Sequence, residues 1–536
     1  MSTGSGPSAS ADARRRAWLA PAVVVAWGVL VGGLPLIAGA PGGDDAYYHA
    51  MRAQQQARCW LLGAPYPRWY PDLNGGLGGP EPRAYPLVPL ALLGALTAAS
   101  GDGVAAISIA TVLIPAVAGL SMLAALRRRG VGAPRALAAS AAWAAAPYLL
   151  IAVHERAALA EALALAVLPA ALEALLPAAP DTRRSEVRAG VCLAVLLATQ
   201  LPLAVMAGAA ALACRLARGR SGHPVSFLIA GSLALCLAAA SWLPNAGSVW
   251  RLQGEHLAGP GYRWQENVLP FGRGSDAVLA GHLNLALGAT AALLLLAVAA
   301  GAGESRLLAG AGLGAVSLAT PVLGWVHGAI PGLAFLQFPW RWIGVASCLG
   351  VLAIAGVTRR AVRAAALVVF LLPVVVPFAW RWRLPPGPPL RPSDPGPVVA
   401  RAATRFGVPP ILPSLPAYLP RGVDLRAALA AAASARREIR LEPASRPGRL
   451  DATASPVAGG TVRLPILADD GWTVEVDGRP SGWSPSESLV AVSVGPGAHR
   501  IAARQTLLPE DLAGVAVSLA TALGLGWFCW LRWRRG

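Results

Sequence analysis

Long apolar runs separated by short arginine-bearing loops dominate this sequence. A helix needs roughly 20 apolar residues to cross the hydrocarbon core of a bilayer, and Ala17 to Ala38 and Leu512 to Leu531 both reach that length. Only 13% of the 536 residues are charged, which is about half the share in a soluble globular domain. The sequence therefore predicts a mainly α-helical, polytopic membrane protein with about twelve transmembrane helices.

The arginine clusters predict how the chain crosses the membrane. All 45 basic residues are Arg, and most stand at the ends of apolar runs, which is the pattern of positive-inside signals. The clusters expected on the cytoplasmic side are 14–16, 127–129, 183–188, 215–220 and 359–363. Both termini are then cytoplasmic.

The charge distribution argues against a nucleic-acid-binding protein, and the cysteine spacing argues against a protein built on disulfides or cysteine metal sites. The net charge of +18 sits at span ends rather than on one exposed face, so we expect no nucleic-acid partner. The 6 Cys residues show no CxxC spacing, so we expect neither a disulfide framework nor a metal site built on cysteine. The need for a divalent metal ion stays open.

A polar segment near the C-terminus has the pattern of a separate module. A Pro-rich stretch over 385–397 predicts an extended linker, and Val423 to Arg440 predicts a helix. Apolar and polar residues then alternate, as in Trp472 to Val476, and Asp477-Gly478 supplies a hairpin turn. We expect a small extracytoplasmic β-rich module similar to a β-sandwich.

These observations predict three regions. Residues 1–380 form the transmembrane domain, which includes a functional first outer loop over 39–86. Residues 381–510 hold the linker and the β-module. Residues 511–536 form the last transmembrane helix and a cytoplasmic tail.

The first outer loop holds the residues best suited to chemistry. Asp44 and Asp45 follow the first predicted span, and Asp45, His49 and Arg52 stand at helical spacings that allow one shared face. A carboxylate at the membrane mouth can accept a proton from a hydroxyl, and His and Arg beside it can hold a phosphate. Alternatively, one of the two acids caps the helix predicted over Ala46 to Leu62.

Other ionisable residues are predicted at the outer ends of later spans. They are His154, Glu155, Arg156 and Glu161, and Arg341 after Pro339-Trp340. Ionisable groups at such depths usually face a cavity or pair with one another, although Glu155 and Arg156 can also form a simple surface pair. Arg341 has two interpretations that stay open, a clamp on a phosphate or a snorkelling side chain in an aromatic belt.

Several motifs together resemble a known family. In the first outer loop they are Asp-Asp-x-x-x-His-x-x-Arg from Asp44, Gly-x-x-Tyr-Pro-Arg-Trp from Gly63, Asn-Gly-Gly-x-Gly-x-Pro from Asn74, and Tyr85-Pro-Leu. Further on they are Glu-Arg-Ala from Glu155 with Glu161-Ala162, the segment FLQFPWRW from Phe335, and GWTVEVDGRP with GPGAHRI after Gly471. The set resembles the membrane proteins labelled 6-pyruvoyl-tetrahydropterin synthase-related, which are similar to GT-C-fold glycosyltransferases and to YfhO-type bacterial membrane proteins. Gln200 departs from the family pattern, in which His is expected.

The resemblance implies a membrane glycosyltransferase that uses a polyprenyl-phosphate-linked sugar as donor, with no certain cofactor. An acid of the first outer loop, Asp44 or Asp45, would be the catalytic base. The residues expected to bind substrate or phosphate are His49, Arg52, Arg68, His154, Glu155, Arg156, Glu161 and Arg341. The acceptor would be an envelope glycan, lipid or protein. The competing interpretations are a non-catalytic membrane protein and a transporter or flippase for lipid-linked glycans.

Overall fold

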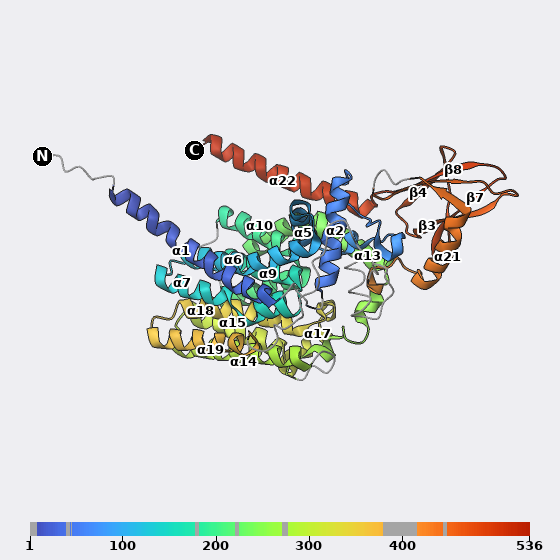
Figure 1. Cartoon of the computed structure of the whole chain (residues 1–536). Coiled ribbons are helices and arrows are strands. Elements are labelled where there is room, and N and C mark those ends of the chain that lie inside the picture. The colour runs from blue at the N-terminus through green and yellow to red at the C-terminus, as the bar shows by residue number, and fades with distance from the viewer. Residues whose placement is uncertain are drawn as a thin grey trace. The chain divides into compact units, whose positions relative to one another are not determined.

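The computed structural model describes residues 8–38, 43, 45–176, 182–219, 224–270, 277–378, 415–442 and 447–535 (Figure 1). Within them the chain is mainly helical and carries one small β-module, as the sequence predicts. It divides into two compact units. Unit 1 comprises residues 1–46, 107–235 and 260–388, and unit 2 comprises residues 47–106, 236–259 and 389–536. The predicted boundaries near residues 380 and 510 stay a prediction.

Apolar helices identify the chain as a membrane protein. Within the residues that the structure describes, five helices are long and apolar enough to cross a bilayer: Trp18–Ile37, Gly103–Arg128, Ala133–Glu155, Val278–Ala300 and Pro509–Leu531. Two bent pairs are Pro224–Leu237 with Ala239–Arg251 (76°) and Glu304–Leu318 with Pro321–Ala329 (81°), and the number rises to seven if each pair is one broken span. The described residues therefore do not confirm about twelve spans. Several predicted crossings correspond to shorter helices, such as α9 (Leu159–Leu175), most of whose residues are buried, and these crossings stay a prediction.

Unit 1 is a helical bundle around one fully buried helix. Its helices are α1 (Ser8–Gly33), η1 (Leu34–Ala38), α6 (Gly103–Arg128), α7 (Ala133–Ala144), α8 (Pro147–Leu150), η2 (Ile151–Glu155), α9, α10 (Arg183–Thr199), α11 (Leu201–Ala217), α12 (Pro224–Leu237), η5 (Trp264–Asn267), α14 (Ala277–Ala300), α15 (Glu304–Leu318), α16 (Pro321–Gly324), α17 (Val326–Ala329), η6 (Leu333–Leu336), η7 (Pro339–Arg341), α18 (Trp342–Ala355) and α19 (Arg360–Phe378). Every residue of α18 is buried, and it packs against α15, α14, α7, α11 and α9. A helix that is apolar on all sides belongs in such a core. A Cβ on Gly344 would lie 2.5 Å from Leu165 Cδ2, so glycine permits this close packing.

The predicted cytoplasmic arginines of unit 1 share two glutamates. Arg128 and Arg188 lie 3.7 and 2.8 Å from Glu173, and Arg129 lies 3.0 Å from Glu304, which also pairs with Arg218. Arginines from three separate predicted loops therefore lie at one end of unit 1, as an alternating set of spans requires. The side of the membrane that this end faces stays a prediction.

The β-module of unit 2 has two antiparallel sheets. The five-stranded sheet has the order β1-β2-β8-β4-β5, and the three-stranded sheet has the order β3-β7-β6. The strands are β1 (Ile439–Leu441), β2 (Arg449–Ala454), β3 (Gly460–Leu467), β4 (Trp472–Val476), β5 (Arg479–Ser481), β6 (Ser484–Ser486), β7 (Leu489–Val494) and β8 (His499–Gln505). Helix α21 (Leu425–Glu438) lies along β3 and β7 (Figure 1).

The predicted alternation and hairpin turn of this module are confirmed, while its extracytoplasmic side stays a prediction and the predicted linker over 385–397 lies outside the described residues. Trp472 and Val474 are buried and Thr473 is exposed, which matches the expected alternation. Asp477 and Gly478 form the two-residue turn between β4 and β5 at positive φ angles of 52° and 77°. Such angles are typical of the tight hairpin turn that Asp-Gly favours.

The first outer loop folds against the C-terminal segment within unit 2. The helices involved are α2 (Ala46–Leu61), α3 (Leu73–Gly76), α4 (Glu81–Ala84), α5 (Leu87–Ser100), α13 (Ala239–Arg251), η4 (Gly254–Ala258), η8 (Pro416–Tyr418) and α22 (Pro509–Arg535). Trp69 packs edge-on against Trp472 with ring centroids 5.1 Å apart. The carbonyl oxygen of Leu77 accepts from the Leu467 N–H at 3.1 Å. Local sequence patterns did not predict this association, because its partners lie about 400 residues apart in the chain.

Candidate functional site

Asp45 is held against the turn that carries Arg156. The Asp45 N–H donates to the Arg156 carbonyl oxygen at 2.9 Å. Gly43 makes this approach possible, since a Cβ there would lie 2.5 Å from Ala157 N and Arg156 C. Ala157 adopts a φ of 47°, a left-handed conformation that costs energy for a residue with a Cβ. Strain of this kind is concentrated at functional sites. Asp44 lies outside the described residues.

Glu161 is the centre of a buried charged cluster in unit 1. Its Oε2 accepts from Arg156 Nη1 and from Arg341 Nε, both at 3.0 Å. Tyr148 donates its hydroxyl to Oε1, and Gln200 Nε2 lies 3.5 Å from Oε2. Glu161 lies in the first turn of α9 and Arg341 ends η7, so this cluster joins two predicted outer span ends. The structure thus brings together Glu161, Arg156 and Arg341 of the predicted set.

Aromatic rings flank the two arginines. Phe338 and Trp340 stack with centroids 4.7 Å apart, and the Arg341 guanidinium lies 4.8 Å from the Phe338 centroid. The Arg156 guanidinium lies 5.8 Å from both rings. Cations near ring faces at these distances are attracted by the ring quadrupole. Burial, together with the Asp45 carboxylate, raises the pKa of nearby Tyr262 above its usual value.

Glu155 forms a second ionisable pair beside this cluster. Its Oε1 lies 2.5 Å from His282 Nδ1, on α14. Both side chains are largely buried. A carboxylate on Nδ1 fixes the orientation of an imidazole and leaves Nε2 to face elsewhere. His154 precedes Glu155 in η2, whose π-helical turn is a form often found at functional sites.

The cluster has the charges needed to bind an anion beside a base. Two guanidinium groups share the single carboxylate of Glu161, so one positive charge remains before Asp45 is counted. Arginine presents several donors in a rigid fork that matches phosphate oxygens. A half-buried carboxylate, Asp45, lies within electrostatic reach of Arg156. This arrangement can hold a phosphate and accept a proton.

No family model matches this chain, and no curated protein matches it either. Among solved structures, the chain is similar to the cryo-EM structure of the arabinofuranosyltransferase AftD from Mycobacteria, mutant R1389S. The sequence identity is 17%, and the TM-score is 0.44. The match covers 73% of this chain and 30% of that one, so the chain spans less than a third of the length of AftD.

The other predicted phosphate ligands, His49, Arg52 and Arg68, belong to unit 2. Arg52 Nε lies 2.9 Å from Glu81 Oε2, and both side chains are buried. Arg68 Nη2 lies 2.7 Å from Asp511 Oδ1, which is also buried. Burial, with the charge of Arg52, lowers the pKa of His49 to about 3, so its imidazole is neutral at ordinary pH. Their role in phosphate binding stays a prediction.

Unit 2 contains further buried ion pairs besides those of Arg52 and Arg68. Arg83 Nη1 donates to Asp469 Oδ1 of the β-module at 2.7 Å, and its Nε lies 3.8 Å from Asp511 Oδ2. The first outer loop is thus joined to the β-module and to α22 by buried charges. Such pairs are weak evidence of net stability but costly to break singly.

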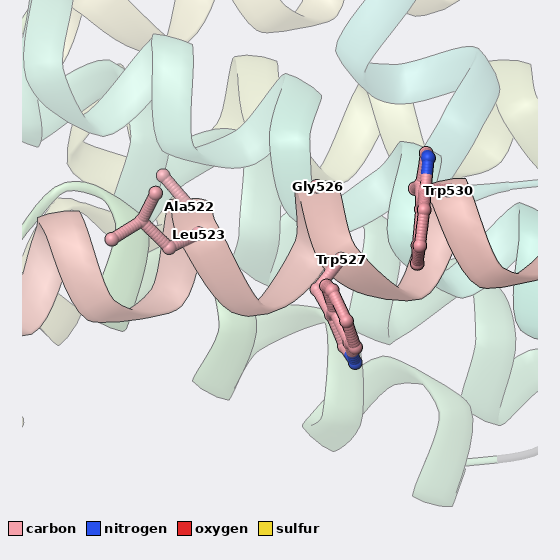
Figure 2. Close-up of a pocket in the computed structure, with 5 residues that line it drawn as sticks. All are labelled: Ala522, Leu523, Gly526, Trp527 and Trp530. Atoms are coloured by element: carbon pink, nitrogen blue, oxygen red, sulfur yellow. The ribbon is translucent and has the colours of Figure 1, made fainter.

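An open hollow on α22 is apolar and lies outside the charged cluster. Its lining consists of Ala522, Leu523, Gly526, Trp527 and Trp530, all on one helix (Figure 2). The Trp527 and Trp530 rings stack at 4.9 Å, and Arg534 lies over Trp530 at 4.1 Å. Apolar residues that end in Trp and Arg are typical of a span that meets the membrane interface.

Sequence reasoning missed Tyr148, which binds Glu161, and His282, which pairs with Glu155. It also missed Tyr262, which lies near Asp45, and Glu81, which pairs with Arg52. The signal available for His282 was its position as an ionisable residue near a predicted span end. Within the part of the chain that the structure describes, no group of three or more His, Cys, Asp or Glu side chains could hold a metal ion.

Proposed function

We propose that this chain is a GT-C-like membrane glycosyltransferase. It transfers a sugar from a polyprenyl-phosphate donor to a cell-envelope acceptor, at the outer face of a bacterial inner membrane. The observation that carries the proposal is the Glu161 cluster, in which Arg156 and Arg341 share one buried carboxylate while the Arg156 backbone binds Asp45. The family resemblance of the motifs around these residues also supports the proposal.

In the proposed reaction, an acceptor hydroxyl loses its proton to the carboxylate of Asp45 or Asp44. The hydroxyl oxygen then attacks the anomeric carbon of the donor sugar. The bond from that carbon to the phosphate oxygen breaks, and the polyprenyl phosphate leaves with the electron pair. Arg156 and Arg341 compensate its charge, because fixed donors aimed at developing charge contribute most to such a step.

Glu161 has a positioning role in this proposal. It holds Arg156 Nη1 and Arg341 Nε at 3.0 Å, which leaves other N–H groups of each guanidinium for a substrate. Fixing both arginines before the substrate arrives removes the cost of ordering them during the reaction. His154, Glu155 and His282 complete the same end of unit 1 and are proposed to contact the substrate.

The test combines lipid analysis with transfer assays on the full-length protein. Mass spectrometry should find polyprenyl-phosphate sugars among the lipids that copurify with it. The identified donor, incubated with envelope extracts, should lose its sugar to an acceptor. Asp45→Asn and Asp44→Asn are made separately and together, with Glu255→Gln as the matched control because Glu255 is exposed in another loop.

The outcomes separate this function from its alternatives. Loss of transfer in one of the two Asp variants, with folding and lipid binding retained, supports the enzyme. Full transfer in both single variants and in the double variant would remove the proposed base. Movement of the intact lipid-linked sugar across vesicles, with its glycosidic bond unbroken, would instead favour a flippase.

A further inference from the structure

The segment over Pro321–Leu336 follows α15 after a sharp bend. α15 and the α16–α17 pair meet at 81°. The sequence contains no Asp, Glu, Lys or Arg from Leu307 to Trp340. We call Pro321–Leu336 the interface segment. It comprises α16, α17 and η6 of unit 1.

Large apolar side chains of the interface segment are exposed. The exposed fractions are 70% for Val322, 59% for Trp325, 48% for Ile330 and 77% for Phe335. In water, exposure of several large apolar side chains on one short segment is unfavourable. Because the interface segment adjoins a candidate membrane-spanning helix, we expect these exposed apolar side chains to contact lipid rather than water.

The interface segment is held firmly from its buried side. His327 is buried, and its ring stacks on Trp264 with centroids 5.9 Å apart. His327 Nδ1 donates to the Gly324 carbonyl at 3.0 Å, and Nε2 accepts from Trp342 Nε1 at 3.3 Å. The exposed residues therefore belong to an anchored structure rather than to a loose loop.

The interface segment ends at the charged cluster. Arg341 Nη1 donates to the Leu336 carbonyl at 3.1 Å, while Arg341 Nε binds Glu161. Phe338 and Trp340 continue the apolar character up to the guanidinium. An apolar surface that leads to an arginine matches a molecule with a hydrocarbon chain and an anionic head.

We propose that the interface segment lies in the outer lipid interface and binds the chain of a polyprenyl phosphate whose head reaches Arg341. This inference rests on the proposed function, because it assigns a binding surface for the donor's lipid. It adds that Val322, Trp325 and Phe335 contact the isoprenoid chain. The chain gains affinity from each buried apolar group, and the phosphate fixes its end.

Photo-cross-linking tests the proposal in the full-length protein. A benzophenone amino acid replaces Phe335, or Val322 in a second variant in case the first fails to fold. Each protein is reconstituted in phosphatidylethanolamine and phosphatidylglycerol vesicles that contain a small fraction of undecaprenyl phosphate. The control places the same amino acid at Val457, which is 97% exposed on the β-module.

We expect undecaprenyl-phosphate adducts at both interface positions and none at Val457. The enrichment over the share of that lipid in the vesicle should be about tenfold, which corresponds to ~1.4 kcal/mol. Adducts with phospholipid alone, adducts with another protein, or no adduct at either position would overturn the proposal. Adduct formation by a protein that transfers no sugar would leave this inference standing while the proposed function fails.

Discussion

The backbone N–H of Asp45 binds the carbonyl oxygen of Arg156, so within unit 1 the segment that follows the first span is joined directly to the turn that carries the charged cluster. Gly43 is the residue that permits this contact, because its Cα lies against the backbone of residues 155–157. The position of the proposed base therefore depends on a glycine and a carbonyl group. A sequence search for reactive or ionisable side chains finds neither of them.

Gly43→Ala should loosen this junction. A Cβ would lie 2.5 Å from Arg156 C and Ala157 N, and relieving that overlap should cost about 1–3 kcal/mol. The measurement is the thermal unfolding midpoint in detergent, together with transfer activity. Gly288→Ala is the matched control, because a Cβ there meets nothing within 4 Å. Equal midpoints for the two variants would contradict the close contact.

Glu161→Gln should destabilise the protein strongly. The change leaves two buried guanidinium groups without their carboxylate, a loss of about 3–5 kcal/mol. Glu304→Gln is the control, since Glu304 also pairs with two arginines but is 39% exposed. Its cost should be about 0–1 kcal/mol per pair. Unfolding followed by intrinsic fluorescence compares the two, and similar losses would show that burial does not set the strength of the Glu161 cluster.

Replacing either of two adjacent acids of the β-module should have very different effects on stability. Asp469 is buried against Arg83 of the first outer loop, whereas Asp470 is 67% exposed beside Arg251. Asp469→Asn should cost about 3–5 kcal/mol and expose α2 to α4 to protease. Asp470→Asn should cost at most about 1 kcal/mol. Limited proteolysis of both variants gives the comparison, and identical cleavage patterns would refute the ion-pair link.

Acid should weaken unit 2 through His49. Its pKa is about 3 in the folded protein, against about 6.5 in an unfolded chain. Because the pKa of His49 is lower in the folded protein, protons bind the unfolded chain preferentially. The contribution of neutral His49 to the free energy of unfolding is therefore complete above pH 6.5 and falls as pH drops toward 3. Within that window the slope is about 1.4 kcal/mol per pH unit.

His49→Gln should flatten this pH dependence of the unfolding midpoint. His256→Gln should leave it unchanged, because His256 is exposed. An unaltered slope in His49→Gln would show that another group carries the acid sensitivity.

The sequence by itself determined the class of the protein and its local elements. Apolar runs predicted the helices at both ends of the chain, and residue alternation with Asp477-Gly478 predicted the β4–β5 hairpin. These features depend on neighbours within a few residues, whose spacing along the chain fixes which side chains share a face. The residue types of the charged cluster were also evident, since Glu161, Arg156 and Arg341 stand near predicted span ends.

Only the tertiary structure decided which of these charges pair. Glu161 joins Arg156 with Arg341, Glu155 binds His282, and Arg68 is neutralised by Asp511 near the far end of the chain. The structure also reduced the number of candidate spans, because breaks and bends divide several predicted crossings into helices shorter than a membrane span. A buried charge needs a partner, and the tertiary fold determines which residues lie close enough to pair with it.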